Sequence, residues 1–257
     1  MSRSAFALLE PDVRRVWAAV RFVDAATRRP VTSALDVQAP GVTWLRKPDG
    51  VQVVVALQPP AVPLADGPAI TAFEAAFDPL PAVPALSLTG RVSDPSGRTL
   101  PRLFTLALPR ATAPAGPLAE RFTPIDVVLD PSAAAPLLST WAVLRVSLQR
   151  AGQPVGNAVL RVHRSAGGAL IGRGLSDARG EALVIVAGLA QVTAGLDDLV
   201  VEREVAAELR ISTDPAPPLN EPFINPDTLA ERADVPRHTQ AVTLASGRTQ
   251  HLAISLP

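Results

Sequence analysis

An internal repeat is the sequence feature that most constrains how this chain can fold. Residues 17–34, WAAVRFVDAATRRPVTSA, align with residues 141–158, WAVLRVSLQRAGQPVGNA, at an offset of 124 residues. Six of the 18 aligned positions are identical: Trp17/Trp141, Ala18/Ala142, Arg21/Arg145, Pro30/Pro154, Val31/Val155 and Ala34/Ala158. The offset is close to half of the 257 residues. One copy near the start of each half predicts two tandem units of the same architecture.

The second copy has the alternation of a β-strand. Between Trp141 and Arg150, apolar residues at 144, 146 and 148 alternate with polar residues at 145, 147 and 149, which predicts a strand with one buried face. Gly152 and Pro154 then break the run, because Gly allows a positive φ and Pro fixes its own φ. Short β-prone runs follow at 158–162, 169–177 and 181–189. Turn signals spaced by about 8–12 residues are typical of a β-sandwich or barrel.

The first unit carries similar signals. Gly41–Leu57 predicts a hairpin whose turn is Lys47-Pro48-Asp49-Gly50, and residues 87–110 predict two strands around Asp94-Pro95-Ser96-Gly97. Ile125–Leu129 is the expected closing strand, and Asp130–Ser139 the expected linker. The proline-rich residues 58–84 predict an extended insertion, with one helical turn possible near Thr71–Phe77.

In the second unit, Leu199–Ile211 reads as a strand, although its Glu, Ala, Arg and Leu residues leave a helix open. Ser212–Asp227 is a loop rich in proline and asparagine, and a candidate contact surface. The chain ends on an expected hairpin around Ala245-Ser246-Gly247. We therefore predict an all-β protein of two tandem β-sandwich units, 13–132 and 138–257, joined by proline-rich segments.

Composition excludes several classes of function. The 24 acidic and 24 basic residues cancel, so the chain has no electrostatic footprint for nucleic acid or an anionic membrane. It contains no cysteine, so it has neither disulfides nor thiolate metal sites. No stretch approaches the roughly 18 apolar residues of a membrane span, and the apolar run before Glu10 is too short for a signal peptide. We expect synthesis in the cytoplasm, with release as part of a particle left open.

No catalytic, cofactor or metal motif is present. His163, His238 and His251 are too far apart in sequence for a local metal-ligand motif. The glycine-rich residues 165–174 lack the lysine of a phosphate loop and lead into a strand. We expect no catalytic residue, no cofactor and no metal site.

The few aromatic residues divide into two groups. Trp17 and Trp141 occupy equivalent places in the repeat, so we expect both to pack in the cores of their units. Trp44 and Phe223 remain as candidate interaction residues, since a sugar-binding platform requires exposed aromatic rings.

The second unit resembles the carboxypeptidase regulatory-like, transthyretin-like group of β-sandwich domains. The resemblance lies in GQPVGNAVLRV at Gly152–Val162 and in GLSDARGEALVIVAGL at Gly174–Leu189. The first unit keeps only Arg29-Pro30-Val31 and Ala34 of this pattern, and Glu181-Ala182 stands where the group commonly has an aromatic residue. The resemblance implies a sandwich fold of the immunoglobulin or transthyretin type.

Members of that group are mostly non-catalytic spacers, attachment modules and parts of assemblies. We therefore expect a structural subunit with other protein subunits as its partners, in an assembly of the phage-tail-like or contractile-injection kind. The alternative is an adhesin-type module that binds carbohydrate or protein. The sequence does not indicate an oligomeric state.

Overall fold

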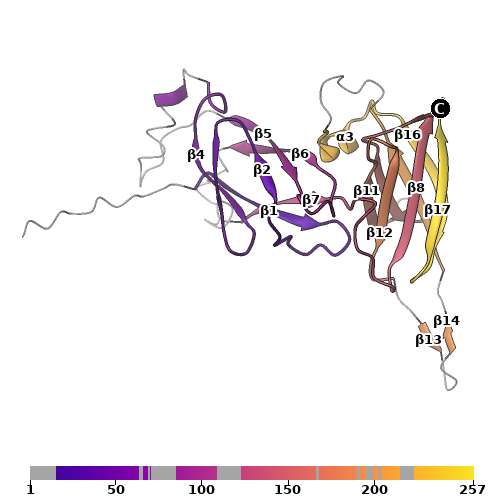
Figure 1. Ribbon diagram of the computed structural model, residues 1–257. Helices are drawn as coiled ribbons and strands as arrows, with labels where there is room; N and C mark the ends of the chain where they lie inside the picture. The colour runs from indigo at the N-terminus through magenta and orange to yellow at the C-terminus, as the bar shows by residue number, and fades with distance from the viewer. Residues whose placement is uncertain are drawn as a thin grey trace, which may run out of the picture.

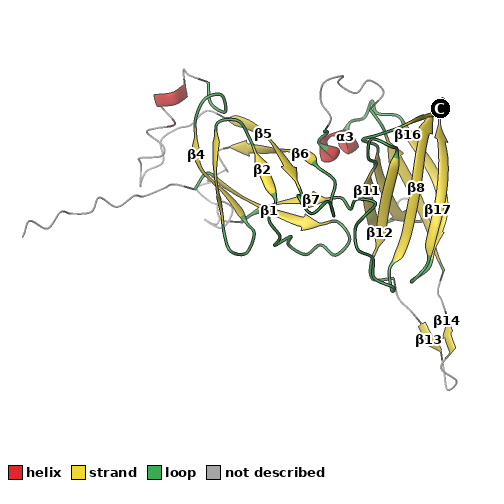
Figure 2. Cartoon of the chain, in the orientation of Figure 1, coloured by secondary structure: helices red, strands yellow, loops and turns green. Residues whose placement is uncertain are grey.

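The computed structural model describes residues 16–63, 66–68, 70, 85–108, 123–165, 168–189, 192–194, 199–201, 204–214 and 223–257. Almost all regular structure in these residues is β-strand, accompanied by the short helix α3 (Pro226–Glu231) (Figures 1 and 2). The expected all-β class is confirmed. The strands up to residue 132 form one group of sheets and the strands from residue 138 onward form another, named here the N-terminal half and the C-terminal half.

The N-terminal half contains two sheets that share one apolar cluster. The first has the order β3 (Val42–Arg46), β4 (Gln52–Leu57), β1 (Ala18–Asp24) and β7 (Ile125–Leu129). The second has the order β2 (Asp36–Gln38), β5 (Leu86–Ser93) and β6 (Arg102–Leu108). Alternate side chains of both sheets meet in the cluster, among them Phe22 on β1 and Phe104 on β6. Their rings pack edge to face, with centroids 5.6 Å apart.

The C-terminal half also contains two main sheets around one cluster. The first has the order β12 (Glu181–Val186), β8 (Ala142–Arg150) and β17 (Thr249–Leu256), with β9 (Gln153–Pro154) also paired to β8. The second has the order β11 (Leu170–Leu175), β10 (Val159–Arg164), β15 (Val205–Ser212) and β16 (Arg237–Leu244). A separate ribbon joins β13 (Val192–Ala194) to β14 (Leu199–Val201). The shared cluster is aliphatic in its buried members.

The two halves pair their strands in the same order. The repeat forms the first strand of each half, β1 and β8, and each runs parallel to the last strand of its half, β7 or β17. Each also pairs antiparallel with a middle strand, β4 or β12. One strand differs, because β3 pairs with β4 whereas β11 pairs with β10 in the opposite sheet. The sequence repeat therefore marks equivalent positions in two similar sheet plans.

Most of the expected strands are confirmed, and two details are wrong. Leu199–Ile211, expected as a strand, contains β14 and β15, and residues 202 and 203 lie outside the described residues. Of the expected loop Ser212–Asp227, Ser212 ends β15 and Pro226 begins α3, whereas residues 215–222 lie outside the described residues. The last two strands do not form a hairpin, because β16 and β17 lie in different sheets. Gly247, in the turn between them, has a φ of +75° and donates its N–H to the Trp141 carbonyl.

One expectation concerns a segment that the structure describes only in part. Most of the proline-rich insertion, including the helical turn at Thr71–Phe77, lies outside the described residues.

Among the described residues, no helix has the length and apolar character that a bilayer crossing requires.

Candidate functional site

A network of two arginines and two aspartates joins the halves. Arg102 begins β6 and Asp130 directly follows β7, whereas Arg173 lies on β11 and Asp227 in the first turn of α3. Arg173 contacts Asp130 through two bonds, Nε to Oδ1 at 2.8 Å and Nη2 to Oδ2 at 3.0 Å. Asp227 receives Nη2 of Arg102 at 2.5 Å and Nη1 of Arg173 at 3.1 Å. Each half thus supplies one arginine and one carboxylate.

Three of these four charged side chains are removed from water. The exposed fractions are 1% for Arg102, 1% for Asp130 and 8% for Arg173, but 45% for Asp227. Arg102 also donates to the backbone carbonyls of Leu103 and Val128, at 3.0 and 2.7 Å. Buried charges are tolerated only when they are paired and hydrogen-bonded, and this network meets both conditions.

The network controls the protonation of its most exposed member. Burial alone would raise the pKa of Asp227, but the charge and hydrogen bond of Arg102, followed by those of Arg173, lower that pKa below its ordinary value. For Arg173 the directions are reversed: burial alone would lower its pKa, but the charges and hydrogen bonds of Asp130 and Asp227 raise it above its ordinary value. Both groups are therefore ionised at neutral pH, as the ion pairs require.

Helix α3 positions the carboxylate of Asp227. Asn225 caps the helix by accepting the Asp227 N–H at 3.2 Å, and Pro226 occupies the first turn, where its missing N–H costs nothing. The Asn225 side chain also accepts a bond from Arg102 at 3.1 Å and donates one to the Thr105 hydroxyl at 3.2 Å. The segment ahead of α3 lies along β6, since the Leu103 N–H donates to the Ile224 carbonyl at 2.8 Å.

Apolar contacts extend this interface on both sides of the network. On one side, Leu100 of the N-terminal half packs against a cluster of the C-terminal half built from Val159, Leu175, Leu229, Ala230 and Val235. On the other side, Ala26 and Ala135 pack with Trp141 over the outer face of the β12–β8 sheet, at Val143, Leu183 and Ile185. The interface therefore combines buried ion pairs with two apolar patches.

The two equivalent tryptophans have different surroundings. Trp17 is 2% exposed and belongs to the N-terminal cluster, as expected. Trp141 is only partly buried and covers the outer face of the β12–β8 sheet, so its expected place in the core is wrong. Strand alternation accounts for Trp141, because it lies on the same face as Val143, opposite the face of the inward Ala142 and Leu144.

The candidate interaction residues Trp44 and Phe223 do not form one platform. Trp44 packs partly buried against the inner cluster, with its ring 6.2 Å from that of Phe104. Its Nε1 is buried without a hydrogen-bond partner in the part of the chain that the structure describes. Phe223 lies under the guanidinium of Arg91. It lines a groove with Leu103 and Thr105, which lie on the outer face of β6, opposite the buried Phe104. Whether either residue binds a partner remains a prediction.

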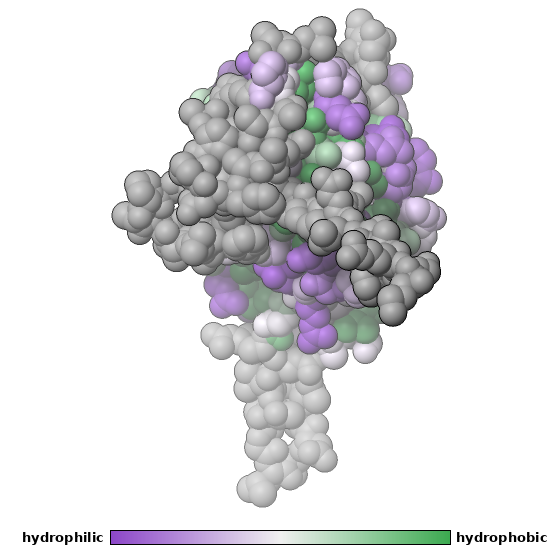
Figure 3. Space-filling view, turned by 90° about the vertical axis from the view of Figure 1, so that its left-hand side faces the viewer, coloured by the Kyte–Doolittle hydropathy of each residue, from purple (hydrophilic) through white to green (hydrophobic). Residues whose placement is uncertain are grey.

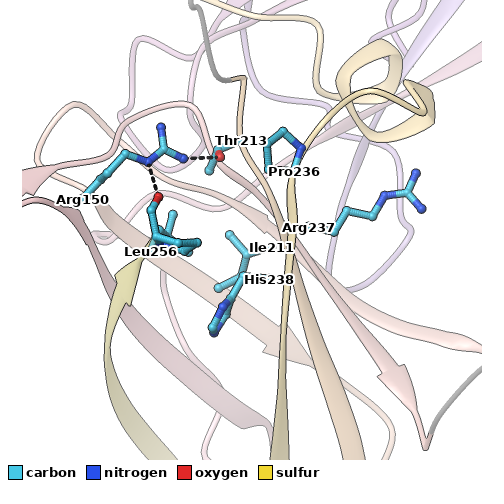
Figure 4. Close-up of a pocket in the computed structure, with 8 residues that line it drawn as sticks. Arg150, Ile211, Thr213, Pro236, Arg237, His238 and Leu256 are labelled. Carbon is cyan, nitrogen blue, oxygen red and sulfur yellow. Dashed lines mark hydrogen bonds between the residues drawn. The ribbon is translucent and has the colours of Figure 1, made fainter.

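Two of the concave regions combine polar side chains with apolar ones and a volume of about 300 Å³ or more. A cleft of about 300 Å³ lies at the interface, and its lining includes Trp141, Asp24, Asp94 and Arg98. A pocket of about 380 Å³ lies at an end of the C-terminal half, lined by Arg150, Ile211, Thr213, Pro236, Arg237, His238, Leu256 and Pro257 (Figure 4). In the end pocket, Arg150 donates to the Pro257 carbonyl at 3.1 Å and to the Thr213 hydroxyl at 2.8 Å.

The three histidines lie apart from one another. His163 on β10 bonds to the Gly168 carbonyl at 3.0 Å, His238 lines the end pocket, and His251 is exposed on β17. Within the described ranges, no group of three or more histidine and acidic side chains could hold a metal ion.

Sequence reasoning missed the four residues of the network. A signal for Arg102 was available, since it occupies an inward position of the alternation RLFTLAL, where Phe104, Leu106 and Leu108 are buried. Arg173 lies between two glycines, Gly172 and Gly174, at which β11 passes close to β12. An added Cβ would come within 2.8 Å of the Val186 side chain at Gly172 and within 2.5 Å of the Leu183 carbonyl at Gly174. Nothing in the sequence pairs these arginines with aspartates 43 and 125 residues away.

On the described surface seen in Figure 3, hydrophilic and hydrophobic residues are interspersed. The candidate site consists of the buried junction between the halves, the interface cleft and the end pocket. Comparison of the chain with protein-family models, with curated proteins and with solved structures finds no match.

Proposed function

We propose that this chain is a non-enzymatic structural subunit that acts as a scaffold in a larger protein assembly. The observation that carries the proposal is the buried network of Arg102, Asp130, Arg173 and Asp227, to which both halves contribute opposite charges. We further propose that each half is a β-sandwich of the immunoglobulin or transthyretin type, so that the chain is a tandem pair held in one orientation. In this junction, the guanidinium groups of the arginines bind carboxylate, amide and carbonyl groups and so hold the two halves together.

The chemistry of the junction supports a rigid pair. Relative motion is the default for two domains unless their interface is large and apolar, and here two apolar patches flank the ion pairs. Separating the halves would leave the charges of Arg102 and Asp130, each 1% exposed, without their partners. That separation would also expose the two apolar patches to water. A subunit with a fixed angle between two modules suits a structural connector.

The assembly that we favour is a phage-tail-like or contractile-injection particle. This choice rests on the resemblance to modules that serve as spacers and attachment points. Its partners would be other protein subunits, and the chain would be made in the cytoplasm before it joins the particle.

Purification of the tagged chain from its native host tests the proposal. We expect co-purification in fixed stoichiometry with structural proteins, seen as a particle by gradient sedimentation and electron microscopy. The variant Asp130→Ala, which disrupts the junction, is expected to reduce incorporation. The exposed Asp126→Ala is the matched control and is expected to assemble normally. A chain that sediments alone at the mass of a monomer would refute the scaffold function.

The interface cleft supports an alternative function, binding of a carbohydrate. Trp141 offers a partly exposed indole, and the lining also holds Asp24, Asp94, Arg98 and several hydroxyl groups. An aromatic face with a few fixed polar groups is the usual composition of a small-ligand site. Titration with mono- and disaccharides, followed by isothermal titration calorimetry, tests this alternative. Binding that Trp141→Phe and Arg98→Ala weaken, but Arg29→Ala does not, would favour it over the scaffold.

A further inference from the structure

Three arginines lie side by side in a row across the outer face of the sheet β11–β10–β15–β16. Arg161 on β10 pairs in register with Arg173 on β11 and with Arg210 on β15. The row lies on the outer face because Leu160 and Val162, the residues on either side of Arg161, are buried in the inner cluster. Like charges placed directly opposite each other destabilise a sheet. The row therefore requires compensating negative charge.

The two outer members of the row have carboxylate partners. Arg173 bonds to Asp130 and Asp227 at the junction, and Nε of Arg210 donates to Oε1 of Glu208 on the same strand. The Nη atoms of Arg210 donate to no residue within the described ranges, and its side chain is 36% exposed. Both outer charges are therefore paired, and Arg210 keeps donors that face no acceptor of the described chain.

Arg161, at the centre of the row, has no such partner. Its guanidinium forms neither an ion pair nor a hydrogen bond with any residue that the structure describes, although Arg161 is partly buried. Burial, followed by the charge of Arg173, lowers the pKa of Arg161 below its ordinary value, and the charges of Asp227 and Glu231 only oppose this shift. The sheet therefore disfavours the charged form of Arg161, and a bound anion would relieve that cost.

One further cation and one carboxylate influence Arg161 from a distance. Arg237 on β16 extends away from the end pocket (Figure 4), and its charge also lowers the pKa of Arg161. Nη2 of Arg237 lies 3.4 Å from the Arg232 carbonyl, which is long for a hydrogen bond. Glu231 on α3 acts in the opposite sense but forms no ion pair with Arg161. Neither group pairs with Arg161, so its guanidinium is available to a ligand.

We propose that Arg161 and Arg210 form a binding site for a tetrahedral oxyanion, a phosphate or sulfate group. Residues directly opposite each other on antiparallel strands have Cα atoms only about 5 Å apart, so one anion can reach both guanidinium groups. A carboxylate is matched by a single guanidinium, whereas two guanidinium groups match the larger number of oxygens on a phosphate or sulfate. The bound charge would also cancel the repulsion within the row. This inference is independent of the proposed scaffold function.

Titration of the full chain with inorganic phosphate at constant ionic strength, followed by NMR of the arginine side-chain N–H groups, tests the proposal. We expect saturable binding that shifts the signals of Arg161 and Arg210. Arg161→Gln should raise the dissociation constant by about tenfold or more, because it removes one of two charge-assisted contacts. Arg164→Gln removes the same charge from the exposed end of the same strand. It is the matched control and should leave the dissociation constant unchanged.

Urea unfolding separates a binding role of Arg161 from a structural one. Without added anion, Arg161→Gln should leave the unfolding midpoint unchanged or raise it, because it removes an unpaired charge from the row. Phosphate should raise the midpoint of the unaltered chain but not that of the variant. A variant that unfolds at lower urea without any anion would show that the Arg161 side chain serves packing, and would overturn the proposal.

Further titrations identify the anion. Shifts that grow linearly with phosphate at exposed arginines throughout the chain would mean non-specific attraction and would overturn the site. Acetate that binds as tightly as phosphate would overturn the preference for a tetrahedral anion. Glycerol phosphate that binds as tightly as inorganic phosphate would support a phosphate ester of a larger molecule as the ligand, and weaker binding would support the free ion. The scaffold function is tested separately by co-purification, so failure of either proposal leaves the other standing.

Discussion

The two halves share a strand order but differ at the equivalent ends of their paired strands. At the last inward pair of β5–β6, Arg102 lies opposite Val92 and bonds to Asp227 of the other half. At the matching pair of β15–β16, His238 lies opposite Ile211 and lines the end pocket. The buried clusters of both halves retain their apolar alternation. The comparison shows that both halves keep the apolar alternation of their inner faces. The residues at the equivalent strand ends differ, and so do their contacts.

The cores differ as well. The N-terminal cluster contains aromatic contacts among Phe22, Trp44 and Phe104, whereas the buried members of the C-terminal cluster are aliphatic. Gly90 on β5 faces Phe104, and the matching inner position of β15 is Leu209. At this rung the N-terminal half fills its core with the ring of Phe104 from β6, whereas the C-terminal half places Leu209 of β15 opposite Gln240 of β16.

The largest expected effect comes from opening the junction. Asp130→Ala removes a carboxylate that is 1% exposed and leaves Arg173, 8% exposed, with only the partly exposed Asp227. Breaking a buried pair from one side costs about 3–5 kcal/mol. Urea unfolding should show that loss, and X-ray scattering should show an increased range of angles between the halves. An unchanged scattering profile in this variant would mean that the apolar patches alone hold the halves together.

A smaller effect is expected from overfilling the N-terminal core. A Cβ added at Gly90 would meet the ring of Phe104 at 2.5 Å, so Gly90→Ala forces that ring to move. Overpacking of this kind costs about 1–3 kcal/mol. Ser87→Ala on the exposed face of β5 is the control, with an expected change within about 0.5 kcal/mol. Equal unfolding midpoints for the two variants would show that Phe104 relaxes without cost.

The contrast between the halves also marks how far sequence reasoning reaches. Alternation predicted β8, and the closing strand 125–129 matches β7 residue for residue, because these signals depend on local periodicity. The fate of Trp141 was missed, since equal sequence positions do not specify whether a side chain faces the core or a neighbouring half. The pairing of Arg102 with Asp227 spans 125 residues, and it depends on how the halves pack, which no local pattern encodes.

Acid should weaken the junction through Asp227. The pKa of this carboxyl is lowered in the folded chain, so its contribution to stability is present above the ordinary aspartate value of about 4 and is lost as pH falls through the lower folded pKa. Because 45% of the side chain is exposed, the contribution is at most about 1 kcal/mol. Asp227→Asn should destabilise the protein at pH 7 and make a smaller difference at pH 2. A difference that grows on acidification would contradict this assignment.

The smallest expected effect concerns an exposed pair that resembles the junction in chemistry alone. Arg21 on β1 donates Nε to Oδ1 of Asp126 on β7 at 2.6 Å and Nη2 to Oδ2 at 3.0 Å. The side chains are 39% and 46% exposed, so water and salt screen the pair, and such pairs contribute about 0–1 kcal/mol. Arg21→Ala should shift the urea midpoint only slightly, and less in high salt. A loss as large as that of Asp130→Ala would show that bidentate geometry, and not burial, distinguishes the two ion pairs.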